Sequence, residues 1–242
     1  MGFFKALSFL TVIRVGHPTH HDDKELAGWG RWYFLVGLLI GALAAGIDFL
    51  MVGRFSTLTS GVIVVTFISA INGGMHLDGL IDTFDAAFSM KPVEEKLKIM
   101  KESTVGALGV VAIILVILLK VTLISEIAAA ERLKTILIFP AVSRGCLLLP
   151  AFLYKYPRAF GKGAGFVKYM TSEILLSGIL IAAIAMFLLL QFKGLIILFA
   201  ALAFSFVTAN FFNKRFNGIT GDVLGTINEL TEVFVLFISI LI

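Results

Sequence analysis

Long apolar runs separated by short polar stretches repeat along most of this chain. A helix that crosses a bilayer needs about 20 such residues, and the runs are too long and too uniformly apolar for the strands of a soluble sheet. The pattern predicts about seven membrane-spanning helices, at residues 31–50, 57–76, 105–124, 134–154, 174–192, 194–212 and 223–242. Only Phe192, Lys193 and Gly194 mark the junction of the fifth and sixth runs, so we expect these two helices to be antiparallel neighbours.

Composition supports a membrane setting. Hydrophobic residues make up 59% of the chain, charged residues 15%, and the mean hydropathy is +1.00, which is more apolar than the surface of a soluble domain allows. We expect an all-α, polytopic helical bundle in the lipid bilayer, formed as one domain over residues 1–242, because no repeat or linker divides the chain. The opening MGFFKALSFLTVIRV lacks a cleavage pattern, so it is interpreted as a retained interfacial helix.

The basic residues predict the orientation. Most of the 20 lysines and arginines fall on one side if the N-terminus is cytoplasmic, as the positive-inside rule requires of cell-membrane proteins. The net charge of +4 is then mainly a topology signal, and no nucleic-acid-binding pattern accompanies it. The single cysteine, Cys146, excludes an internal disulfide and a cysteine metal cage.

This topology brings four polar segments to the cytoplasmic face: GGMHLDGLIDTFDAAF (73–88), KESTVGALG (101–109), YKYPRAFGKGAGF (154–166) and NGITGDVLG (217–225). Convergence of distant segments on one face is typical of a functional site. Within the first segment, Asp78, Asp82 and Asp85 are spaced i, i+4, i+7 and would occupy an arc of roughly 60° on a helix. Three carboxylates on one stripe repel one another and suit a hard cation such as Mg²⁺ carrying substrate phosphates.

The second half of the predicted site comes from the last segment. Asp222 begins a helix and is expected to supply a metal ligand opposite Asp78, Asp82 and Asp85, while nearby glycines let a phosphate approach backbone N–H groups. The paired glycines 73 and 74 have the same predicted role, or else serve tight helix packing. The residues predicted to bind substrate are Gly73, Gly74, Lys101, Ser103, Arg144, Asn217, Thr220 and Gly221.

Arg144 lies deep within a predicted span, at a depth similar to that of Glu229 and Glu232. Charges inside a membrane are rare and usually paired, so Arg144 is predicted to form a structural pair with one of these glutamates. The competing interpretation is that Arg144 binds a substrate phosphate.

Three motifs, in this order and at these intervals, resemble those of the cobalamin synthase family, the adenosylcobinamide-GDP ribazoletransferases. They are GGMHLDGLIDTFDAAF, IMKESTVGALGV and NGITGDVLGTINELTE. The likeness extends to FFKALSFLTVIRV and WYFLVGLLIGAL and so covers most of the chain. Two departures stand out: Ala86 replaces the family's usual Gly, and Thr104, Val105 and Gly106 replace Arg-Ile-Gly, which removes an Arg contact.

The resemblance implies a membrane enzyme that joins adenosylcobinamide-GDP to α-ribazole, or to its 5′-phosphate, with release of GMP. Mg²⁺ on Asp78, Asp82, Asp85 and Asp222 would clamp the pyrophosphate, and Asp82, Asp78 or His76 would take the proton of the attacking hydroxyl. The sequence leaves open which of them does so, and whether the chain forms homo-oligomers or associates with other enzymes of cobalamin assembly.

Three other activities match parts of the same pattern. A CDP-alcohol phosphotransferase would need a D-G-x-x-A-R core. Here Asp78 and Gly79 are followed by Leu80, Ile81 and Asp82, so the Ala of that core is missing. An aromatic prenyltransferase would need two Asp-rich clusters, and this chain has one. A cation transporter could use Asp78, Glu229 and Glu232 as an ion path, although transporters carry polar residues through the membrane depth and use broken, symmetric helices.

Overall fold

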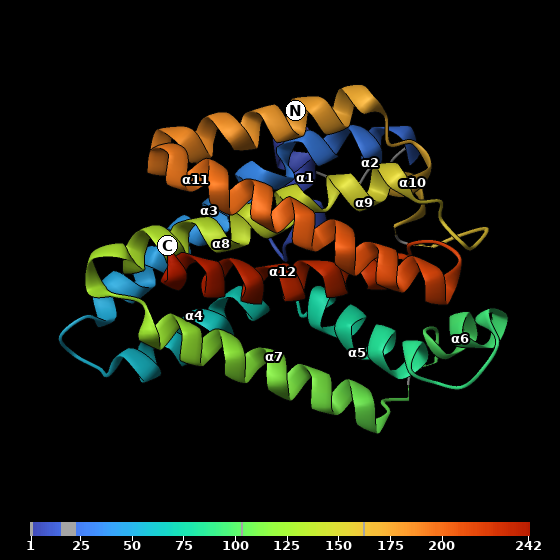
Figure 1. The fold of residues 1–242 in the computed structure, drawn as a ribbon, viewed down its shortest axis with the longest axis horizontal. Helices are drawn as coiled ribbons and strands as arrows, with labels where there is room; N and C mark the ends of the chain where they lie inside the picture. Colours follow the sequence, from blue (N-terminus) through green and yellow to red (C-terminus); the bar gives the residue numbers. More distant parts are fainter. Residues whose placement is uncertain (1, 16–22, 103, 162) are drawn as a thin grey trace.

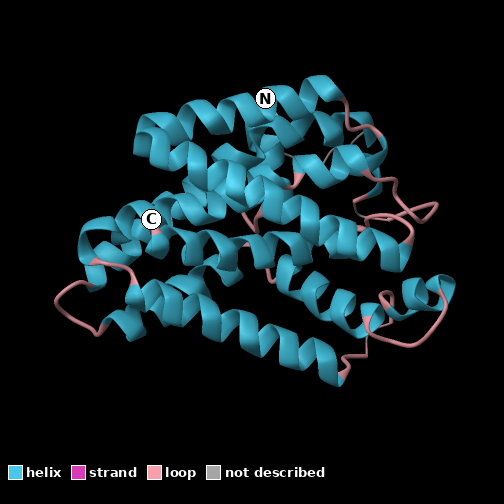
Figure 2. Cartoon of the chain, in the orientation of Figure 1, coloured by secondary structure: helices cyan, strands magenta, loops and turns pink. Residues whose placement is uncertain are grey.

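The computed structural model describes residues 2–15, 23–102, 104–161 and 163–242, and all regular structure in these ranges is helical (Figures 1 and 2). This confirms the all-α prediction. The helices are α1 Gly2–Leu10, α2 Asp23–Trp29, the 3₁₀ turn η1 Gly30–Trp32, α3 Tyr33–Met51, α4 Thr57–Ile71, α5 Met75–Ala87, α6 Val93–Ile99, α7 Ala107–Glu126, α8 Ala129–Cys146, α9 Leu148–Leu153, α10 Ala164–Lys168, α11 Ser172–Phe216 and α12 Gly221–Leu241.

Among the described residues, five helices are long and apolar enough to cross a membrane, and there are six such spans if the bent pair α4 and α5 counts as one. The count of five takes α11, residues 172–216, as one span. The sequence predicted two runs there, and α11 does consist of two helices that meet at a break at Gln191, where φ is 54° and ψ is −136°. Figure 1 shows the two halves of α11 running in opposite directions from that break, which confirms the predicted antiparallel pair.

A sharp bend between α4 and α5 turns the chain by 89°. Gly73 and Gly74 occupy it with φ values of 61° and 69°, a left-handed conformation that favours glycine. Their N–H groups donate to the carbonyl oxygens of Ala70 and Ser69 at the end of α4, at 2.9 and 3.0 Å. The paired glycines therefore end one helix and redirect the next, and their N–H groups are not free for the phosphate contact that the sequence suggested.

Helix α8 forms the centre of the bundle and is largely buried. It packs closely on α3, because Gly37 and Gly41 lie directly against the α8 backbone near Pro140 and Leu137. By contrast, α7 and α11 expose apolar side chains such as Leu118 and Leu188. This distribution, with a packed centre and apolar outer helices, is that of a membrane bundle.

The two ends of the bundle differ in their polar groups. At one end, Asp48 of α3 and Arg132 of α8 form a buried ion pair, with the Arg132 Nη2 atom 2.8 Å from Asp48, and Ser60 also donates to Asp48. The Arg132 side chain is buried and joins α3, α4 and α8. The opposite end gathers the α5–α6, α9–α10 and α11–α12 connections (Figure 1).

The N-terminal segment forms α1, as predicted, and buries Ala6, Leu7 and Leu10. It packs against α2 and α3. Its location at a membrane interface stays a prediction.

Candidate active site

The four polar segments predicted to converge do so around one cleft of about 510 Å³, which we call the acidic cleft. The α5 stripe, the segment before α7, the α9–α10 loop and the start of α12 all contribute to it. The lining residues are Asp78, Asp82, Met100, Lys101, Glu102, Thr104, Val105, Tyr156, Arg158, Phe160, Gly161, Gly221 and Asp222. Of the predicted site residues, this cleft therefore brings together Asp78, Asp82, Lys101, Gly221 and Asp222.

Asp222 reaches the stripe because α12 packs against α5 with almost no side chain between them. A Cβ atom on Gly79 would lie 2.7 Å from the backbone oxygen of Asp222 and 2.9 Å from its Cα. The Thr226 hydroxyl also donates to the Gly79 carbonyl oxygen at 3.0 Å. Gly79 stands between Asp78 and Asp82 in the sequence, so the contact sets Asp222 beside both carboxylates.

Electrostatic interactions link the acids of the cleft. The half-buried carboxylate of Asp82 is repelled by Asp78, Asp222 and Asp85, with Asp78 the strongest of the three, and is attracted by Arg158. Arg158 approaches Asp222 with its Nη1 atom 3.4 Å from Oδ2 and donates from Nη2 to the Leu97 carbonyl at 3.0 Å. One guanidinium thus faces several carboxylates, an excess of negative charge that favours a bound cation.

Asp85, the third member of the stripe, interacts with α7 instead. Its two carboxylate oxygens accept hydrogen bonds from the backbone N–H groups of Gly106 and Gly109, at 2.7 and 2.8 Å. A carboxylate at this position satisfies free N–H groups and complements the dipole of the helix. Asp85 does not line the acidic cleft, and its contacts fix the start of α7 beside α5.

The α9–α10 loop contributes two polar side chains that were not among the predicted site residues. Tyr156 and Arg158 both line the cleft. Burial raises the pKa of Tyr156 above its usual value, so its hydroxyl stays neutral and able to donate. Pro157 packs beside Gly218, whose φ is 154°, so a glycine motif at the α11–α12 turn supports this loop. That adjacency joins chain segments about 60 residues apart in the sequence, so local patterns did not reveal it.

The remaining predicted substrate residues take other positions. The Thr220 hydroxyl accepts a hydrogen bond from Val223 N at 3.2 Å and lies 3.4 Å from Asp222 Oδ2, so it caps α12 and orients Asp222. Asn217 ends α11 with a φ of 53° and does not line the cleft. Ser103 lies outside the described residues.

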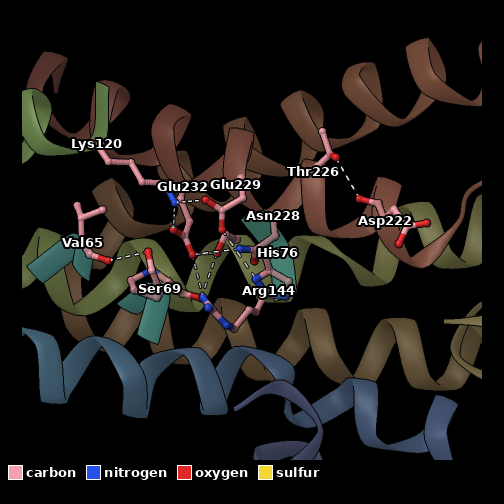
Figure 3. Close-up of polar contacts among 12 residues, drawn as sticks. Val65, Ser69, His76, Lys120, Arg144, Asp222, Thr226, Asn228, Glu229 and Glu232 are labelled. Carbon is pink, nitrogen blue, oxygen red and sulfur yellow. Dashed lines mark hydrogen bonds and ion pairs between the residues drawn. The ribbon is translucent and has the colours of Figure 1, made fainter. Parts of the chain in front are cut away.

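Arg144 belongs to a buried ion network deeper in the bundle, formed with Lys120, Glu229 and Glu232 (Figure 3). Its Nη1 atom lies 3.0 Å from Glu232 Oε1, and both side chains have 0% exposure. This confirms the predicted structural pair and identifies Glu232 as the partner. Lys120 of α7 contacts both Glu229 and Glu232. The Lys120 contacts were not predictable from local sequence patterns, because they join helices more than 100 residues apart.

The two glutamates are therefore neutralised by cations within the bundle. A transporter that used Glu229 and Glu232 as an ion path would need these carboxylates free to bind the ion. Figure 3 shows Asp222 near the beginning of α12, apart from the network. The acids of the cleft and the acids of the network are thus two separate groups.

His76 lies between these two groups. Its side chain is buried, and its Nδ1 atom is 4.0 Å from Glu229 and has no hydrogen-bond partner among the described residues. It lines a small cavity beside Lys120, Glu229 and Glu232, and also a second pocket that adjoins Asp78 and Asp222, but it does not line the acidic cleft. The structure does not bring His76 to the position expected of a base acting in the cleft.

The described residues contain no three His, Cys, Asp or Glu side chains close enough to complete a metal site by themselves. Mg²⁺ is usually held by one or two carboxylates together with substrate phosphates and water, not by a cage of protein ligands. Asp78, Asp82 and Asp222 around one cleft fit that mode of binding.

Comparison with known proteins agrees with the motifs. The profile of a family described as cobalamin-5-phosphate synthase matches residues 2–240. The adenosylcobinamide-GDP ribazoletransferase of Desulforamulus reducens is 35% identical over 236 residues, covering 98% of this chain and 94% of the relative. The protein of the same description from Clostridium acetobutylicum is 34% identical over 241 residues, covering 98% and 96%. No solved structure matches the chain.

Proposed function

The chain belongs to the cobalamin-5-phosphate synthase family, and we propose that it is an adenosylcobinamide-GDP ribazoletransferase whose reaction takes place in the acidic cleft. In this reaction adenosylcobinamide phosphate passes from adenosylcobinamide-GDP to a hydroxyl of α-ribazole, or of its 5′-phosphate, and GMP leaves. The observation that carries the assignment of the site is the shared cleft of Asp78, Asp82, Asp222, Lys101 and Arg158.

We propose that the pyrophosphate of the GDP-activated corrinoid lies between the carboxylates and the two cations. Arg158 supplies two neighbouring donors on a planar group, which suits phosphate oxygens, and Lys101 adds a second positive charge at the rim. Gly221 begins α12, so the positive end of that helix also faces the cleft. These groups favour a bound polyanion even though three acids surround it.

Asp78, Asp82 and Asp222 would hold Mg²⁺, which when bound would supply positive charge to offset the negative charge that develops on the departing GMP. The choice of these three ligands follows from their position on the cleft. Asp85 has the separate role of holding α7 through Gly106 and Gly109.

A residue of the chain also has to accept the proton that the attacking hydroxyl loses. As the acceptor hydroxyl oxygen bonds to the corrinoid-side phosphorus, the bond from that phosphorus to the GMP oxygen breaks and the hydroxyl proton moves to a base. We propose Asp82 for this role, because its carboxylate lines the cleft beside Asp78 and Asp222. His76 is less suited, since it does not line the cleft.

We further propose that the N-terminus and the acidic cleft face the cytoplasm of the cell. The basic residues of the chain support this orientation, because Lys96, Lys98, Lys101 and Arg158 gather at the end of the bundle that holds the cleft. Both substrates are small molecules, and the bilayer is the only other partner that the composition requires.

The direct test is to incubate membranes that contain the protein with labelled adenosylcobinamide-GDP and α-ribazole, with and without Mg²⁺. We expect GMP and a cobalamin product to form in equal amounts, only when both substrates and Mg²⁺ are present. If the protein instead transferred a phosphoalcohol from a CDP-alcohol and left the corrinoid untouched, a CDP-alcohol phosphotransferase activity would replace this proposal.

A further inference from the structure

A second pocket adjoins the acidic cleft at Asp78 and Asp222. It has a volume of about 90 Å³, and both pockets share Asp78, Gly221 and Asp222. The other walls are mostly apolar or aromatic and include Phe9, Tyr33 and Phe166, together with the polar side chain of His76. We call this the aromatic pocket. A molecule in it would have one end against the carboxylates and the other among rings.

The aromatic walls come from three separate parts of the chain. Tyr33 of α3 stacks on Phe166 of α10 with ring centroids 4.9 Å apart and also lies against Phe9 of α1, at 6.4 Å. Gly30 makes room for this arrangement, since a Cβ there would lie 2.8 Å from the Phe166 ring. The stack fills the space between α1, α3 and α10 and lies beside the acids at the wall of the pocket.

Tyr33 carries the only polar group of this aromatic stack, and that group is unsatisfied. The side chain has 1% exposure, and its hydroxyl has no hydrogen-bond partner among the described residues. An unpaired buried hydroxyl costs about 1–3 kcal/mol, so it is rarely retained without a use. A ligand with a hydrogen-bond acceptor at its inner end would satisfy it.

We propose that the aromatic pocket binds the base of the nucleoside acceptor, an aromatic nitrogen heterocycle, and that the Tyr33 hydroxyl donates to its unsubstituted ring nitrogen. This inference rests on the proposed function and names the subsite of its second substrate. The ribose extends from the base toward Asp78 and Asp222, where its hydroxyl meets the phosphate held in the acidic cleft.

The size of the pocket agrees with this occupant. One water needs roughly 10–15 Å³ of such volume, so about 90 Å³ accommodates on the order of six to nine non-hydrogen atoms. A benzimidazole ring system is of that size. The corrinoid is many times larger and does not fit, which leaves the acidic cleft and its open rim for the other substrate.

The test uses two α-ribosides of equal size as acceptors, one of benzimidazole and one of indole, which lacks the unsubstituted ring nitrogen. For the wild-type enzyme we expect the KM of the benzimidazole riboside to be lower by about tenfold, the usual contribution of one hydrogen bond. In Tyr33→Phe the two KM values should become equal, while the KM for adenosylcobinamide-GDP stays unchanged. Tyr169→Phe, at an exposed tyrosine outside both pockets, should keep the tenfold preference.

A second variant tests the pocket without the hydroxyl. Leu224 lines the aromatic pocket and not the acidic cleft, so Leu224→Phe should fill it and raise the KM for both ribosides at least tenfold. The subsite would be wrong if wild-type enzyme used the two ribosides equally well, if Tyr33→Phe kept the full preference, or if Leu224→Phe left both KM values unchanged. Absence of GMP release from the wild-type enzyme would instead refute the proposed function itself.

Discussion

Asp222 lies directly against Gly79, with the backbone of one helix touching that of the other. A Cβ on Gly79 would lie 2.7 Å from the backbone oxygen of Asp222. No side chain therefore separates α5 from α12 at this point. This contact converts a stripe of acids on one helix into a site made by two helices, because it adds Asp222 to Asp78 and Asp82. The same helix α12 then continues to Glu229 and Glu232 in the buried ion network.

Gly79→Ala tests this contact. The added methyl group meets backbone atoms, which cannot rotate away, so α5 and α12 must separate at a cost of about 1–3 kcal/mol. We expect lower thermal stability in detergent and a loss of GMP release of at least about tenfold, since Asp222 moves away from Asp82. Gly46→Ala is the matched control, because a Cβ at Gly46 would have no atom within 4 Å. Equal behaviour of the two variants would contradict the close approach.

Asp85 should contribute to the stability of the protein and not to Mg²⁺ binding. Replacing it by Ala removes both acceptors of the Gly106 and Gly109 N–H groups and should lower stability by about 1–2 kcal/mol. The Mg²⁺ concentration for half-maximal GMP release should stay the same, because Asp85 does not line the cleft. Titration of activity with Mg²⁺ checks this, and a large rise in the required Mg²⁺ would return Asp85 to the set of metal ligands.

The Arg144–Glu232 pair should appear as coupling in a double-mutant cycle. Arg144→Met leaves a buried carboxylate with one cation fewer and should destabilise the protein by about 3–5 kcal/mol. Adding Glu232→Gln should restore part of this loss, whereas adding Glu229→Gln should restore little, because Glu229 contacts Lys120 and not Arg144. Thermal inactivation in detergent measures the cycle. A stable Arg144→Met with a raised KM for the GDP-activated corrinoid would instead support phosphate binding by Arg144.

Much of this architecture was predictable because it depends on local patterns. The apolar runs predicted the helices, and the short Phe192–Gly194 junction predicted the turn within α11. The i, i+4 spacing of Asp78 and Asp82 predicted that both acids lie on one face of a helix, and both line the cleft. The ion pair between Arg144 and a glutamate was predictable because unpaired charges are rare inside a membrane.

Features that depend on packing between distant helices were not predictable in the same way. Asp85 has the spacing of a stripe member, but the start of α7 lies against it and takes both its oxygens. Gly73 and Gly74 resemble a phosphate loop in composition, yet their positive φ values serve an 89° bend. The role of Arg158 was not predictable, because its contact with Asp222 joins residues 64 positions apart in the sequence.

Arg158 should contribute mainly to binding of the GDP-activated substrate. Arg158→Gln keeps polar atoms but removes the charge and the planar pair of donors, so we expect the KM for adenosylcobinamide-GDP to rise about tenfold or more. The KM for α-ribazole should change little, since Arg158 does not line the aromatic pocket. Arg54→Gln, at an exposed arginine outside the cleft, is the control. An equal rise in both KM values would argue that Arg158 holds the loop and not the phosphate.

GMP release from Asp82→Asn shows whether the carboxylates of the acidic cleft carry out the transfer. This change removes the charge with almost no change in shape, so the protein should insert and fold as the wild type does and keep its thermal stability. We expect the rate to fall by far more than tenfold, because a loss of about 1.4 kcal/mol of transition-state stabilisation already accounts for a factor of ten. Glu94→Gln, in the exposed helix α6, should keep the wild-type rate. A folded Asp82→Asn enzyme that kept more than about a tenth of the wild-type rate would contradict this role of the carboxylates.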